Sequence, residues 1–126
     1  MKLSMGIIKF EVSVPEAFRA IAAFRQDRRA ALEQFSHQVQ SAAADVINRL
    51  LQAEMTLFLG SPDQIGNKRN GYADRDYVLK GIGAIRIHMP IDRKRSFRSD
   101  VVPHHEQIDP RLKEDMAALH LAGMWR

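Results

Sequence analysis

Nine lysines and arginines gather between Lys68 and Arg98, where only three aspartates oppose them. This segment therefore carries a net charge of +6 in a chain whose total is +4, so the rest of the sequence is slightly acidic. Arginine is the more frequent cation there, and its forked guanidinium suits two-point contacts to phosphate. A local positive surface of this kind predicts a polyanionic partner, with DNA or RNA first among the candidates.

The candidate DNA-binding side chains share a positive charge and a position in this segment. They are Arg69, Arg75, Arg86, Arg93, Lys94, Arg95 and Arg98. Tyr72, Tyr77 and Phe97 lie between them, as is common in nucleic-acid-binding surfaces. Contacts from such cations would mainly hold the protein on the phosphate backbone rather than read bases. The alternative is a solvated run of charge that binds nothing.

Other chemistries find less support in the sequence. The chain has no cysteine, which excludes disulfides, zinc–thiolate sites and cysteine nucleophiles and fits a reducing cytoplasm. His104, His105 and Glu106 lack the spacing of a zinc motif. No serine lies in a nucleophile-elbow motif. We therefore expect no metal, no cofactor and no catalytic residue in this chain.

The acidic residues near the basic segment each have a structural explanation. Asp92 can pair with Arg93 or Arg95, and Asp109 precedes a proline as a helix cap would. No apolar run reaches the 18 or so residues of a membrane span, and the N-terminus does not resemble a secretory signal. We expect a cytoplasmic protein without membrane contact.

The elements that must position these residues indicate an α+β fold, mainly helical, in three parts. Residues 1–60 form an N-terminal arm and a long helical stem, residues 61–103 a basic β-hairpin segment, and residues 104–126 a C-terminal helix. Alternation over residues 7–14 predicts a strand or extended arm. Ser13 and Glu16 have the spacing of a capping box, with Pro15 in the first turn.

Residues 16–59 contain no proline or glycine, and they predict two helices with a break near residues 26–29 and an end at Gly60. Apolar side chains recur there every three or four residues, which places them on one stripe of a helix. They are Leu32, Phe35, Val39, Ala42, Val46, Leu50, Ala53 and Leu57. The stripe is either core or a seam between copies of the chain, and its small residues favour a homo-oligomer.

Residues 61–75 read as a polar linker rich in turn formers. Residues 76–80 and 84–89 then predict a hairpin with Ile85 and Ile87 on an apolar face and Arg86 and His88 on a basic one. Residues 101–103 suggest a short third strand. The final helix is expected to begin after Asp109 and to end near Gly123.

An ordered series of motifs over about residues 45–124 resembles the N-terminal region of Mutator-family bacterial insertion-sequence transposases. The series comprises Glu54–Gly60, Arg69–Tyr72, Gly83 with Ile85 and Ile87, Pro90–Arg93, Phe97, Val102–Pro103, Asp109–Leu112 and Leu119–Met124. The family usually has glycine where this chain has Arg95, which only adds charge.

The resemblance implies binding of DNA at the ends of a mobile element. The family's three metal-binding acids belong to a domain C-terminal to the matched region, so none is transferred to a residue here. Residues 110–122 resemble the first helix of the family's helix-turn-helix, of which the second helix is absent. The expectation is thus a DNA-binding transposase fragment that lacks its catalytic domain. The alternative is an oligomerising module or remnant that modulates a full-length transposase without binding DNA.

Overall fold

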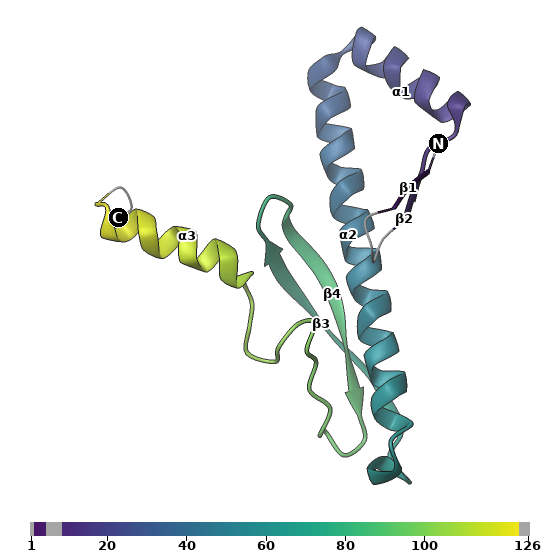
Figure 1. Ribbon diagram of the computed structural model, residues 1–126, viewed down its shortest axis with the longest axis vertical. Coiled ribbons are helices and arrows are strands. Elements are labelled where there is room, and N and C mark those ends of the chain that lie inside the picture. The colour runs from purple at the N-terminus through teal and green to yellow at the C-terminus, as the bar shows by residue number, and fades with distance from the viewer. Residues whose placement is uncertain (1, 5–8, 124–126) are drawn as a thin grey trace. The chain divides into compact units, whose positions relative to one another are not determined.

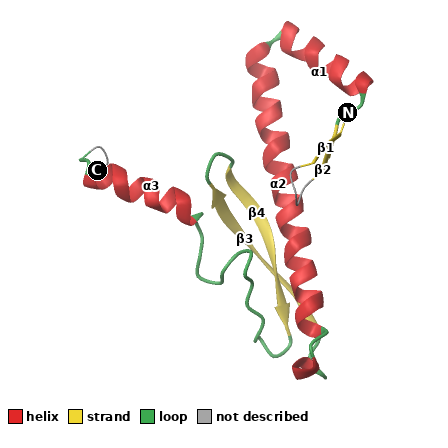
Figure 2. Ribbon diagram, viewed as in Figure 1, coloured by secondary structure: helices red, strands yellow, loops and turns green. Residues whose placement is uncertain are grey.

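A computed structural model describes residues 2–4 and 9–123 of the chain (Figure 1). In chain order the elements are β1 (Lys2–Ser4), β2 (Lys9–Glu11), α1 (Val14–Gln26), α2 (Arg28–Leu59), a 3₁₀ turn (Pro62–Gln64), β3 (Arg69–Leu79), β4 (Gly83–Asp92) and α3 (Pro110–Leu121). The strands form two antiparallel pairs, β1–β2 and β3–β4. Helices dominate, as Figure 2 shows, so the predicted α+β class is confirmed. The chain divides into two compact units, residues 1–39 and 40–126.

The helix boundaries in the first unit follow local capping signals. Ser13 caps α1 by accepting a hydrogen bond from the backbone N–H of Glu16, and the Glu16 side chain accepts one from Ser13 in return. Asp27 separates α1 from α2, and its side chain accepts from the N–H of Ala30. The capping box and the break near residues 26–29 are therefore confirmed. Of the predicted arm, positions 7 and 8 lie outside the described residues.

The core of the second unit lies between α2 and the β3–β4 hairpin. Leu51 of α2 is fully buried with Tyr77, Ile85, Ile87 and Val102. Ile85 and Ile87 alternate with Arg86, so the predicted apolar face of the hairpin is confirmed. This face is the one that the C-terminal half of α2 covers (Figure 1).

The part of α2 that packs on the hairpin is not the predicted apolar stripe. Leu51 and Met55 are fully buried, whereas Phe35 is 56% and Leu57 78% exposed. The sequence shows two apolar faces on this helix, and the hairpin covers the one that periodicity alone did not single out. The stripe from Leu32 to Leu57 is therefore not the core of the single chain.

The hairpin is longer than predicted. Residues 69–75 were expected in a linker but belong to β3, which pairs with β4 from Leu79 opposite Gly83 to Arg69 opposite Asp92. An irregularity between Arg69 and Tyr72 accommodates Gly71, whose φ of 81° is open to glycine at little cost. Glycine and asparagine in this stretch mark a bulge within a strand rather than a loop.

Some backbone groups on both edges of the hairpin have partners outside it. On the β4 side, Gln40 donates to the carbonyl of Ile82 in the turn, and the Asn48 side chain accepts from the N–H of His88 in β4. Along β3, Val78 exchanges backbone hydrogen bonds with residues 107 and 109. The prediction of a third strand at residues 101–103 is wrong, because Val102 turns into the core and only a single bridge forms further along, at Ile108.

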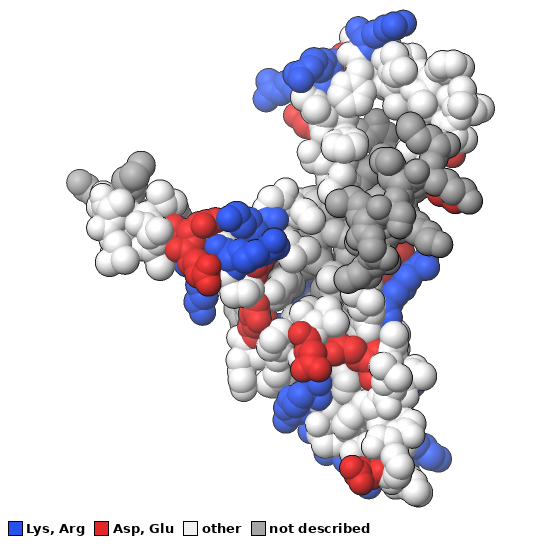
Figure 3. All heavy atoms as spheres, in the orientation of Figure 1, with Lys and Arg blue, Asp and Glu red and all other residues white. Residues whose placement is uncertain are grey.

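The final helix begins where its cap predicts. Asp109 accepts a hydrogen bond from the N–H of Arg111, Pro110 occupies the first turn, and Gly123 has the positive φ typical of a helix end. Lys80 of the hairpin forms an ion pair with Asp115, and Figure 3 shows basic and acidic side chains adjoining at the beginning of α3. No helix within the described ranges is long and apolar enough to cross a membrane.

Candidate nucleic-acid interface

A short loop after β4 carries the highest density of positive charge. This basic loop comprises residues 93–98 and contains Arg93, Lys94, Arg95 and Arg98 with no acidic residue. The loop directly follows Asp92, which is only 1% exposed. A carboxylate buried to this degree must have its hydrogen-bonding capacity filled.

Asp92 organises the loop by accepting hydrogen bonds from three residues. One oxygen accepts from the N–H of Phe97 at 3.1 Å, and the other accepts from Asn67 at 2.7 Å and from Ser96. Burial alone would raise the pKa of Asp92, but these hydrogen bonds outweigh it and hold the pKa well below its usual range. The expected pairing of Asp92 with Arg93 or Arg95 is wrong, because its oxygens are directed to the turn itself.

The far end of the loop is fixed by two further contacts. The ring of Phe97 is buried against Phe58 of α2, with ring centroids 5.4 Å apart. Glu54 of α2 accepts a hydrogen bond from the N–H of Asp100 at 2.7 Å and another from the Ser99 hydroxyl. A loop held at both ends presents its charges without a large ordering cost when a ligand binds.

The four cations of the basic loop are exposed, and none forms an ion pair with any described residue. Arg98 donates to the carbonyls of Phe97 and Arg95 and keeps its remaining donors. Arg95 has φ 54°, the left-handed region that costs an L-residue about 1–2 kcal/mol. Arg95 thus keeps its charged side chain at a position where the backbone of arginine is strained and that of glycine would not be.

The strand register brings Lys68 and Arg69 beside this loop. Arg69 lies opposite Asp92, and the carbonyl of Lys68 accepts from the N–H of Arg93 at 2.8 Å. Arg69 donates to Gln52 and Thr56 of α2, so part of its guanidinium is occupied. Lys68 belongs to the basic segment but is not among the seven predicted site residues, because only the pairing of distant strands reveals its position beside the loop.

Two of the predicted site residues have partners that reduce their availability. Arg75 donates to the carbonyls of Pro103, His104 and Glu106, and so holds the segment after the basic loop. Arg86 forms an ion pair with Asp76 across the hairpin at 3.0 Å. The structure thus separates the seven candidates into an exposed group of four in the loop and three with roles in the fold.

The outer face of the hairpin, defined here as Tyr72, Asp74, Asp76, Arg86 and His88, has an acidic side chain beside each basic one. Cross-strand pairing sets Asp76 opposite Arg86 and Asp74 opposite His88, and each pair is in contact. The sequence alternation correctly separated this face from the apolar one. It did not show that the register places an acid opposite each base.

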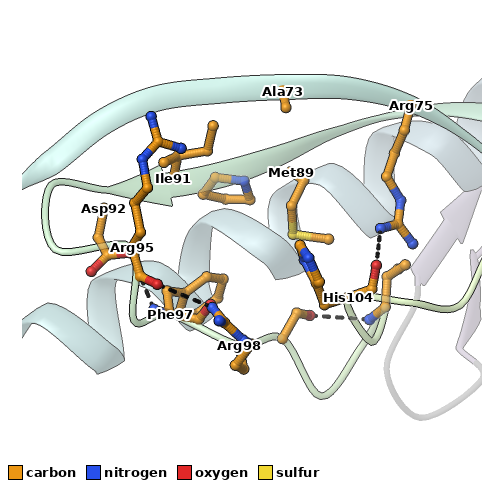
Figure 4. A pocket seen from close by; sticks show the side chains of 12 residues that line it. Ala73, Arg75, Met89, Ile91, Asp92, Arg95, Phe97, Arg98 and His104 are labelled. Carbon is orange, nitrogen blue, oxygen red and sulfur yellow. Dashed lines mark hydrogen bonds between the residues drawn. The ribbon is translucent and has the colours of Figure 1, made fainter.

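A pocket of about 410 Å³ lies between the basic loop and the hairpin (Figure 4). Arg95 and Arg98 line it near one end, while Arg75 and His104 lie at the other with Met89 between them. The described residues contain no group of three or more histidine or acidic side chains arranged to hold a metal ion. The arrangement therefore places arginine side chains next to a partly apolar hollow.

Comparison with known proteins bears on this surface. A search of curated proteins finds no match. The family model described as "Transposase, Mutator family" matches residues 16–125, which is most of the chain. The match includes most of α1 and all of α2, the hairpin, the basic loop and α3, and it agrees with the resemblance seen in the sequence. The chain therefore belongs to the Mutator family of transposases.

Proposed function

We propose that this chain is a DNA-binding part of a Mutator-family transposase and that the basic loop makes its main contact with DNA. The observation that supports the proposal most is the group of four exposed cations, without an ionic partner among described residues, on a loop held by Asp92 and Phe97. Guanidinium and ammonium groups in this setting suit phosphate.

The proposed contact is to the DNA backbone of element ends or of any duplex. A four-cation loop can neutralise several phosphates, but contacts to phosphate do not select a base sequence. The proposal covers binding and not strand cleavage, since Asp92, the acid next to the loop in sequence, serves the fold by holding the turn. A cytoplasmic location is part of the same proposal.

Salt dependence tests the proposal. Affinity for an inverted-repeat duplex and for a random duplex would be measured by fluorescence anisotropy across salt concentrations. Displacement of counterions from about four phosphates predicts a slope of about −4 for log K against log salt. Absence of binding to both duplexes at low salt would contradict the proposal.

We also propose that the chain self-associates through the apolar stripe of α2. Within the first unit Phe35 is 56% exposed, and within the second Leu57 is 78% exposed. Side chains of this size at helical spacing are suited to a seam with a second copy. Light scattering should show a mass above that of the monomer that persists in high salt and falls in Phe35→Glu. A monomer at every concentration would contradict this part.

A further inference from the structure

We propose that the pocket beside the basic loop receives one nucleotide turned out of the DNA helix, with its phosphate near Arg95 and Arg98 and its base against the apolar wall. The inference rests on the DNA binding proposed above and adds a specific ligand-binding site to it. It is carried by two features of the pocket: its size and its two-part lining.

The pocket is a partly open hollow large enough for a ligand group. Its volume of about 410 Å³ lies within the usual range of small-molecule sites, about 300–1,000 Å³. The space can therefore accept a ligand group of the size of a base and its sugar.

The lining has an apolar part and a cationic part. Apolar side chains from both strands and from the following loop form the wall: Ala73, Met89, Pro90, Ile91, Phe97 and Val102. Arg95 and Arg98 supply positive charge at the same pocket. Asp92 also lines it as an anion, but its single negative charge is outweighed by the positive charges of Arg75, Arg95 and Arg98 in the same lining.

These features together favour a nucleotide over a simple anion. An inorganic anion would use the arginines and leave the apolar wall uncovered, whereas a nucleotide has an anionic and an apolar part. Because the pocket adjoins the basic loop, a nucleotide that remains within a bound strand can reach it. Turning a base out of a duplex costs a few kcal/mol and costs least when the base is unpaired.

An unpaired nucleotide therefore provides the sharpest test. Affinities would be measured by anisotropy for three short duplexes of one sequence: fully paired, with one extrahelical thymidine, and with one extrahelical abasic residue. The thymidine bulge should bind roughly tenfold more tightly than the other two, corresponding to about 1.4 kcal/mol. Ala73→Phe, which fills the pocket from β3, should abolish this preference and retain affinity for the paired duplex.

Ala84→Phe is the matched control, because it adds the same side chain at an exposed position of β4 that does not line the pocket. It should keep the tenfold preference. Equal affinity of the unmodified chain for all three duplexes would overturn the proposed nucleotide site and leave the proposed function intact. No binding to any duplex would overturn both. Equal gains from the thymidine and abasic bulges, or equally tight binding of free thymidine monophosphate, would also overturn the inference.

Discussion

The basic loop and the outer face of the β3–β4 hairpin both carry arginine at exposed positions, but their surroundings differ. On the hairpin, Arg86 faces Asp76 and His88 faces Asp74, so each base has an acid beside it. In the loop, four cations have no such partner among the described residues. The acid next to them in sequence, Asp92, is buried and accepts hydrogen bonds from the turn. Equal charge in the sequence therefore does not mean equal capacity to bind an anion.

The largest effect is expected from removal of the carboxylate on which the loop is built. Asp92→Ala leaves donors of Asn67, Ser96 and Phe97 without an acceptor, and should lower the free energy of unfolding by about 2–4 kcal/mol. Urea denaturation measures it. Asp100→Ala is the control, since Asp100 is exposed, and should change stability by less than about 0.5 kcal/mol. Equal small losses in both variants would contradict the role of Asp92.

The same carboxylate should make stability depend on acid pH. Its pKa is lower in the folded protein than the value of about 3.9 in an unfolded chain, so its contribution is present above about pH 4 and is lost as the pH falls below that. Urea titrations between neutral and acid pH should show a steeper decline for the unmodified chain than for Asp92→Asn. Parallel curves for the two proteins would show that Asp92 is not stabilised as an anion.

Removing the two acids of the hairpin's outer face should convert this face into a second binding surface. Asp74→Asn with Asp76→Asn leaves Arg86 and His88 without acids, and affinity for duplex DNA should rise by roughly three- to tenfold, or about 1 kcal/mol. Glu33→Gln with Asp45→Asn changes the net charge equally but releases cations on α2 instead. A similar rise in both double variants would indicate a net-charge effect without regard to position.

The smallest effect concerns the strained arginine of the loop. Arg95→Gly should raise the free energy of unfolding by about 0.5–1 kcal/mol because glycine adopts φ 54° freely, and it should weaken DNA binding severalfold through the lost charge. Lys94→Gly is the matched control and should lose affinity without gaining stability, since its φ is not positive. A destabilised Arg95→Gly variant would contradict the assignment of strain.

Features set by neighbours in the sequence were predictable. The cap of α1 by Ser13, the break at Asp27 and the cap of α3 by Asp109 depend on residues within a few positions of one another. The separation of Ile85 and Ile87 from Arg86 also follows from the period of a strand. The cations of the basic loop were predictable for the same reason, because they are neighbours in the sequence.

Features set by distant pairing were not predictable. Asp92 was assigned to its neighbours in sequence, yet it accepts from Asn67, which lies 25 residues away. The buried side of α2 depends on which face the hairpin covers, and both faces of that helix are apolar enough to serve. The ionic partners of Arg86 and His88 likewise require the strand register, which hydrophobic alternation alone leaves open.

The central claim, that the basic loop and not the hairpin face binds DNA, is tested most directly by the salt dependence of two variants. Neutralising Arg93, Lys94 and Arg95 together to glutamine should reduce the slope of log K against log salt by about 3, and lower affinity at low salt by roughly a hundredfold or more. Arg86→Gln should change the slope by less than about 0.5 because this cation is already paired. An unchanged slope in the loop variant, or an equal loss in both, would contradict the account.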